Sequence, residues 1–132
     1  MTEDCLFCKI VAGEIPCYKI YEDDKYLAFL DIYPLTPGHT LVVPKKHYRW
    51  VWDVEPAGEY FEIVTKIVKH FQKKLDKDLI VSLTYGEWVP HAHYQVIPPG
   101  GLLPKVMEKF SLKNEKRVSE QEAKEILQKL SM

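Results

Sequence analysis

The chain has 132 residues, of which 46% are hydrophobic and 28% are charged. This length and composition fit one globular domain with a buried core and leave little room for two. The 18 basic and 19 acidic side chains give a net charge of -1, which offers no reason to expect binding to nucleic acid or a membrane, although a small anionic ligand remains compatible with it.

The N-terminus, from Met1 to Asp4, is acidic, and no long apolar run follows it. We therefore expect neither a signal peptide nor a transmembrane span, and hence an intracellular, cytoplasmic protein. The chain has three cysteines, and two of them form a Cys5-x-x-Cys8 pair. This pattern favours metal or thiol chemistry over the disulfide framework of a secreted protein.

The first elements along the chain are a short helix and a hairpin. Residues 5–12 end at Gly13, which is typical of a helix C-terminus. Residues 18–21 and 26–31 are rich in aromatic and branched side chains and are separated by four polar residues, so they predict two antiparallel strands.

A strand, a long helix and another strand follow. Residues 39–43 predict a strand that Pro44 ends. From Glu59 to Leu75 the apolar residues recur with the three- and four-residue spacing of an amphipathic helix. Residues 79–83 predict the fourth strand.

The fifth expected strand contains the sequence His-Ala-His-Tyr-Gln-Val-Ile-Pro, residues 91–98. Because side chains alternate between the two faces of a strand, His91, His93 and Gln95 share one face. The simplest interpretation is a half-buried strand whose polar face carries histidines. Three polar groups in a row also favour a reactive site.

The region after residue 98 becomes rich in lysine and glutamate. Ser119 followed by Glu122, with apolar residues on either side, is a capping box that predicts a C-terminal helix. We expect one domain over residues 1–132, with a core at about 5–98 and a C-terminal extension at about 99–132.

The Cys5-x-x-Cys8 pair supplies two soft ligands, and a structural zinc site needs two more from Cys or His. The candidates to complete it are His39, His47, His70 and His91. Two of these have structural explanations, because His39 opens a strand and His70 lies within the long helix. The alternative interpretation is reduced thiols with ordinary surface histidines.

His91 and His93 are about 7 Å apart along a strand. A zinc ligand must come within about 2.1 Å of the metal, so His93 stays available for chemistry when His91 binds it. A neutral imidazole nitrogen is a competent nucleophile at phosphorus. Gln95 can donate its amide to a phosphate oxygen without carrying charge.

The sequence resembles the histidine triad (HIT) family from Cys5 to Pro98. The motifs that carry the resemblance are Cys5-Leu6-Phe7-Cys8-Lys9-Ile10-Val11, Glu14-Ile15-Pro16, Tyr21-Glu22-Asp23-Asp24, Ala28-Phe29-Leu30-Asp31-Ile32, Pro37-Gly38-His39, the segment from Leu41 to His47, and the His-x-His-x-Gln sequence. Each motif is weak alone, but together they are specific.

The resemblance implies an α+β domain with a five-stranded antiparallel sheet, usually a homodimer, that binds nucleotides and attacks their α-phosphorus. The family nucleophile matches His93. In members with the Cys-x-x-Cys element, the zinc ligands match Cys5, Cys8, His47 and His91.

The resemblance also implies a nucleotide pocket. The ribose contact of the family matches Asp31, for which a turn-forming acid is the alternative. The residues expected to contact the base are Phe7, Ile10, Phe29, Ile32 and Val89. For Phe29 and Ile32, simple core packing is an equally good interpretation.

Two features depart from the family pattern. Gln95 replaces the third histidine, as in the transferase branch, and a neutral amide cannot protonate a leaving group. Substrates whose leaving group is already acidic, such as phosphate or pyrophosphate, should suit this site. The loop before His91 carries Glu87 and Trp88 where polar phosphate contacts are common, and an unpaired Glu87 would repel a phosphate.

We therefore expect a nucleotidyl hydrolase or transferase that forms a covalent nucleotidyl intermediate on His93, with Gln95 holding the phosphate. The substrate is a purine or other nucleotide. The alternative from a different class is a nucleotide-binding or zinc-stabilised interaction module with little turnover.

Overall fold

The computed structural model describes residues 4–110 and 116–132. Most of the acidic N-terminus (1–3) and part of the C-terminal extension (111–115) lie outside the described residues. Within the described ranges, none of the helices combines the length and the apolar character that crossing a membrane requires.

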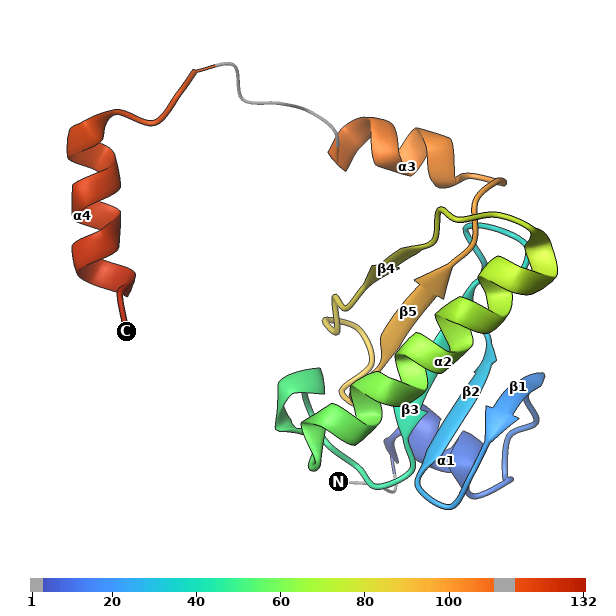
Figure 1. Ribbon diagram of the computed structural model, residues 1–132. Helices are drawn as coiled ribbons and strands as arrows, with labels where there is room; N and C mark the ends of the chain where they lie inside the picture. The colour runs from blue at the N-terminus through green and yellow to red at the C-terminus, as the bar shows by residue number, and fades with distance from the viewer. Residues whose placement is uncertain (1–3, 111–115) are drawn as a thin grey trace.

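Five strands form one antiparallel sheet in the order β1-β2-β3-β5-β4 (Figure 1). The strands are β1 (Lys19–Glu22), β2 (Tyr26–Leu30), β3 (Thr40–Pro44), β4 (Val81–Leu83) and β5 (Tyr94–Ile97). The five-stranded antiparallel sheet expected from the sequence is confirmed. β4 begins two residues later than expected and β5 three residues later than its expected start.

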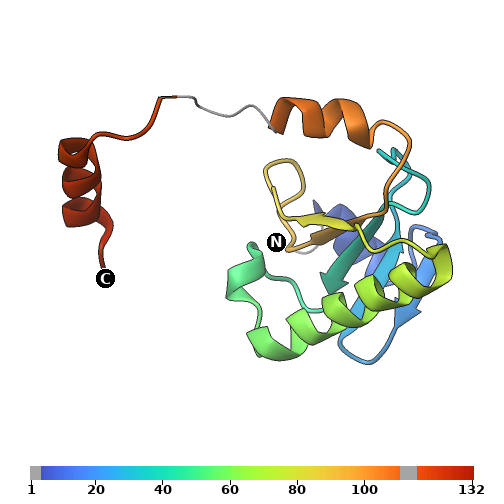
Figure 2. The same cartoon turned by 45° about the horizontal axis from the view of Figure 1, so that its top comes forward.

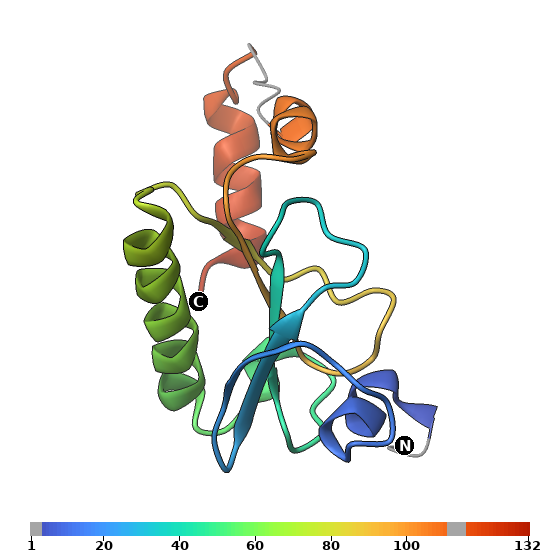
Figure 3. The ribbon, with the colours of Figure 1, turned by 90° about the vertical axis from the view of Figure 1, so that its right-hand side faces the viewer.

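Two helices lie on opposite faces of the sheet (Figure 3). The long helix α2 (Ala57–Leu75) follows a short 3-10 helix, η2 (Val51–Asp53), and starts two residues before its expected first residue. The short helix α1 (Leu6–Val11) lies on the other face, as do the loops that precede β3 and β5.

Each face of the sheet has its own apolar cluster, because successive strand residues point to opposite sides. Tyr26, Ala28 and Val42 pack toward Tyr60 and other residues of α2. The residues between them pack with Phe7 of α1 on the other face, and these are Leu27, Phe29, Leu41 and Val43. The two clusters fix which side chains can meet on the α1 face.

The described part of the C-terminal extension contains two helices, α3 (Leu103–Phe110) and α4 (Glu120–Leu130). The capping box at Ser119 and Glu122 is present and opens α4, which confirms the expected C-terminal helix. No pattern in the sequence had led us to expect α3. Figures 1 and 2 show α4 standing apart from the sheet, and none of its residues is buried.

Candidate functional site

The His-x-His-x-Gln segment enters the sheet later than expected. The ladder begins at Tyr94, because the backbone N–H of Ala92 donates to Tyr48 O at 2.7 Å, outside the strands, and His91 N–H turns back to Val89 O. The alternation of side chains still holds. Ala92 packs with the α2 cluster, while the rings of His91 and His93 both lie edge-on to Phe7 on the opposite face.

Four potential metal ligands converge beside α1: Cys5, Cys8, His47 and His91. Their ligand atoms all lie within 4.8 Å of one another. His91 Nδ1 is 3.4 Å from Cys5 Sγ and 3.3 Å from Cys8 Sγ. His47 Nδ1 is 3.2 Å from both Cys8 Sγ and His91 Nδ1. A tetrahedral zinc site requires about 3.3 to 3.8 Å between such atoms, so this cluster can hold a metal ion.

The protonation of the cluster also suits a metal. His91 Nε2 donates to Pro44 O at 2.7 Å, which leaves the Nδ1 lone pair facing the thiols. Burial lowers the pKa of His91 to about 4 and also lowers the pKa of His47, so both rings are neutral. Burial raises the pKa of the Cys8 thiol to about 11, so a bound cation must displace that proton.

The other two histidines considered as ligands lie elsewhere. His70 is exposed on α2, on the opposite side of the sheet from α1. His39 is buried and forms a hydrogen bond with Gln95.

His93 is held as a neutral ring with one free nitrogen. Its Nδ1 donates to His91 O at 2.8 Å, and this bond assigns the lone pair to Nε2. The side chain is 9% exposed, and burial lowers its pKa. The Phe7 ring packs edge-on against it with 5.1 Å between centroids. In this arrangement Nε2 can act as a nucleophile without a separate base.

His39 fixes the orientation of the Gln95 amide. Leu35 N–H donates to His39 Nδ1 at 3.0 Å, so His39 Nε2 carries the hydrogen and donates to Gln95 Oε1 at 2.8 Å. The amide NH₂ of Gln95 is thereby left for another acceptor. Asp31 Oδ2 lies 3.8 Å from His39 Nε2. The sequence predicted His39 as a strand opener or a possible metal ligand but not its contact with Gln95, because the pairing of Leu41 with Gln95 that brings the two side chains together is a property of the sheet register.

Asp31 has contacts that fit both a turn-forming acid and a residue facing the candidate site. Its Oδ1 accepts from Tyr33 N–H at 2.9 Å, which is the turn contact of an Asx residue. Its Oδ2 is directed to the His39 side of the site, and the side chain is 24% exposed.

Four of the five residues expected to contact a base gather in the α1-face cluster: Phe7, Ile10, Phe29 and Val89. Phe29 is 4% exposed and is a core residue whatever else it contacts. Ile32 differs, because its side chain is 69% exposed. Core packing is therefore the wrong interpretation for Ile32.

The altered loop before His91 carries its acid and its tryptophan at the surface. Glu87 accepts a hydrogen bond from the Tyr85 hydroxyl, and both side chains are exposed. Trp88 is 85% exposed and packs edge-on against Tyr85. The loop is joined to the motif where Thr84 Oγ1 donates to His93 O at 2.9 Å.

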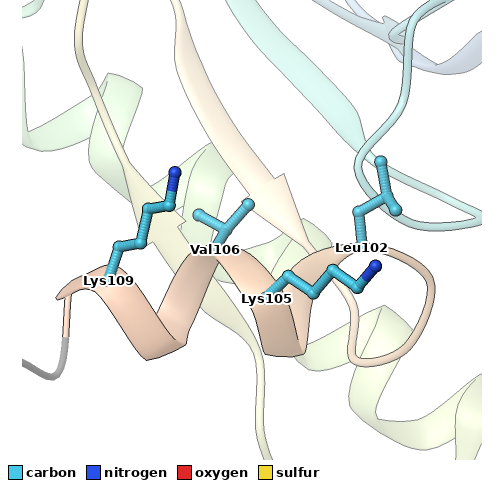
Figure 4. Close-up of a pocket in the computed structure, with 4 residues that line it drawn as sticks. All are labelled: Leu102, Lys105, Val106 and Lys109. Carbon is cyan, nitrogen blue, oxygen red and sulfur yellow. The ribbon is translucent and has the colours of Figure 1, made fainter.

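A cavity of about 400 Å³ lies along α3, where the side chains of Leu102, Lys105, Val106 and Lys109 border it (Figure 4). None of the residues proposed from the sequence as ligands, nucleophile or nucleotide contacts lines it. The cavity therefore belongs to the C-terminal extension and not to the histidine site.

Comparison with known proteins matches residues 12–101 to the HIT domain. The chain is 37% identical to the adenosine 5'-monophosphoramidase hnt1 of Schizosaccharomyces pombe, over 71% of this chain and 73% of that protein. It is also 37% identical to the adenylylsulfatase HINT3 of Arabidopsis thaliana, over 74% of this chain and 53% of that protein.

Among solved structures, a crystal structure of a HIT family protein from Bacillus subtilis is similar over 96% of this chain and 94% of that one. The TM-score is 0.78 and the sequence identity 34%. The likeness extends beyond the region matched by the domain and so takes in the C-terminal extension.

Proposed function

This chain belongs to the HIT family, and on that premise we propose that it is a nucleotide hydrolase or nucleotidyltransferase acting through a covalent intermediate on His93. The observation that carries the proposal is the hydrogen bond from His93 Nδ1 to His91 O, which leaves the Nε2 lone pair free. The names of the two enzyme relatives, an adenylylsulfatase and an adenosine monophosphoramidase, support an adenine nucleotide as the substrate.

In the proposed reaction, His93 Nε2 forms a bond to the α-phosphorus, and the bond from phosphorus to the leaving group breaks with its electron pair. Water or another acceptor then attacks the same phosphorus, loses its proton to solvent, and releases the nucleotide and neutral His93. Gln95 donates its amide to a phosphate oxygen in both steps, because His39 holds its carbonyl end.

Asp31 accepts from the ribose hydroxyls in this proposal, and the base lies on the apolar surface of the α1 face. Phe7, Ile10, Phe29 and Val89 belong to the apolar cluster on that face. Ile32, which is exposed two residues after β2, covers the base from outside.

We assign the metal cluster to a structural zinc ion held by Cys5, Cys8, His47 and His91. The donor set of two thiols and two imidazoles supports zinc, and four protein ligands leave no open position for a substrate. When bound, the ion supplies cross-linking between α1 and the start of the motif. The ion would affect the chemistry only by helping to position His93.

The homodimer implied by the family resemblance is also part of the proposal. β4 is an edge strand of the sheet, and among the described residues no strand pairs with its outer side, which supports pairing with a second copy. Light scattering of the purified protein tests it, and a monomer mass at micromolar concentration would contradict it.

The second candidate function is a nucleotide-binding module with little turnover, and the surface placement of Glu87 and Trp88 favours it. The two functions separate in one experiment. We expect intact mass spectrometry after mixing with adenosine 5'-phosphoramidate or ATP to detect an acid-labile nucleotidyl adduct, or its hydrolysis product, in the wild type and not in His93→Ala. Nucleotide binding with neither adduct nor product would favour the module.

A further inference from the structure

Arg49 lies next to the reactive segment although it falls outside the motifs that relate this chain to its family. The backbone bond from Ala92 N–H to Tyr48 O places residue 48 against the motif, and Arg49 is the next residue. Its Nη1 donates to Gly86 O at 2.9 Å. Because Thr84 of the same loop is bonded to His93 O, the guanidinium is tied to the loop that borders the nucleophile.

The guanidinium is held in a fixed plane. Its carbon lies 3.7 Å from the centroid of the Trp50 ring, which itself stacks on Trp52. Gly86 allows this close approach, since its φ is +75° and an added Cβ would lie 3.1 Å from the Trp50 ring. A stacked arginine loses little further freedom when it binds a planar or tetrahedral anion.

Arg49 has no acidic partner among the described residues. No ion pair joins it to a carboxylate there, and the nearby acid of the loop, Glu87, is bonded to Tyr85 instead. A guanidinium has five N–H donors, and the bond to Gly86 O occupies one.

We propose that Arg49 binds the anionic leaving group of the substrate, a phosphate, pyrophosphate or sulfate attached to the α-phosphorus, and so determines substrate specificity. This inference rests on the proposed nucleotide site but not on turnover. When the bond from phosphorus to oxygen breaks, its electron pair stays on the leaving oxygen. Gln95 cannot supply a proton there, and hydrogen bonds from Arg49 stabilise the charge without any proton transfer.

The test is equilibrium binding of ADP and AMP, which differ by the group that Arg49 would contact. In a His93→Ala background, which prevents turnover, we expect Arg49→Gln to weaken ADP binding by about 10- to 100-fold relative to AMP, as loss of a charge-assisted contact does. Arg49→Lys keeps the charge and should recover part of the preference.

Lys66→Gln provides the matched control. Lys66 also places its charge over an aromatic ring, that of Tyr21, but on the long helix on the other side of the sheet. It should leave the ratio of the ADP and AMP affinities unchanged.

The outcomes separate the inference from the proposed function. An equal loss for both nucleotides in Arg49→Gln would mean that Arg49 only supports the loop, and it would overturn the inference. An unchanged preference for ADP over AMP in Arg49→Gln would overturn the inference as well. If the preference depends on Arg49 while wild-type protein forms no adduct or product, the inference stands and the proposed enzyme fails. Wild-type protein that binds neither nucleotide would overturn both.

Discussion

Ile32 offers a test of the base pocket that protein stability does not confound. Its side chain is 69% exposed, so Ile32→Ala should change the free energy of unfolding by less than about 0.5 kcal/mol. Full burial of an isoleucine stabilises by roughly 1.5 to 3 kcal/mol. A base that covers the exposed fraction should therefore gain about 1 to 2 kcal/mol from this side chain, which corresponds to a roughly 5- to 30-fold increase in the Kd of AMP in Ile32→Ala.

Isothermal titration calorimetry with AMP measures the affinity, and urea denaturation measures the stability. The matched control is Leu79→Ala, because Leu79 has a similar size and is 64% exposed just before β4. It should alter neither quantity. An AMP affinity within twofold of wild type in Ile32→Ala, in a folded protein, would refute the assignment of this residue to the base pocket.

Two further predictions concern the metal and the leaving group. Elemental analysis under reducing conditions should find about one zinc per chain in the wild type and in His70→Ala, and much less in His47→Ala; a metal-free wild type would contradict the assignment. Gln95→His should raise the turnover of adenosine phosphoramidate relative to ATP by about 100-fold, since it adds a general acid for an amine leaving group, and an unchanged ratio would show that proton donation is not limiting.

Local patterns sufficed to predict the elements of the sheet and the long helix. The spacing of apolar residues places α2 within two residues of its observed start, and the capping box at Ser119 marks the start of α4. α3 was missed although Leu103, Val106, Met107 and Phe110 follow the spacing of an amphipathic helix, because the segment is only eight residues long.

Only those residues of the candidate site that belong to a sequence motif could be predicted. The spacing of Cys5 and Cys8 suggested two ligands, and the family resemblance selected His47 and His91 from the histidines available. The contact between His39 and Gln95 depends on the register of β3 against β5. Arg49 depends on a loop contact to Gly86, and neither contact follows from the order of residues.

The sulfur of Cys5 joins two parts of the molecule. It caps α1 by accepting from Cys8 N–H at 3.4 Å, and it lies 3.4 Å from His91 Nδ1 in the metal cluster. A six-residue helix does not hold its shape alone, so α1 and the Phe7 ring that supports His93 depend on this anchor. Chelators and thiol oxidants should therefore weaken the activity indirectly, by disordering α1 beside the proposed nucleotide site without competing with the nucleotide.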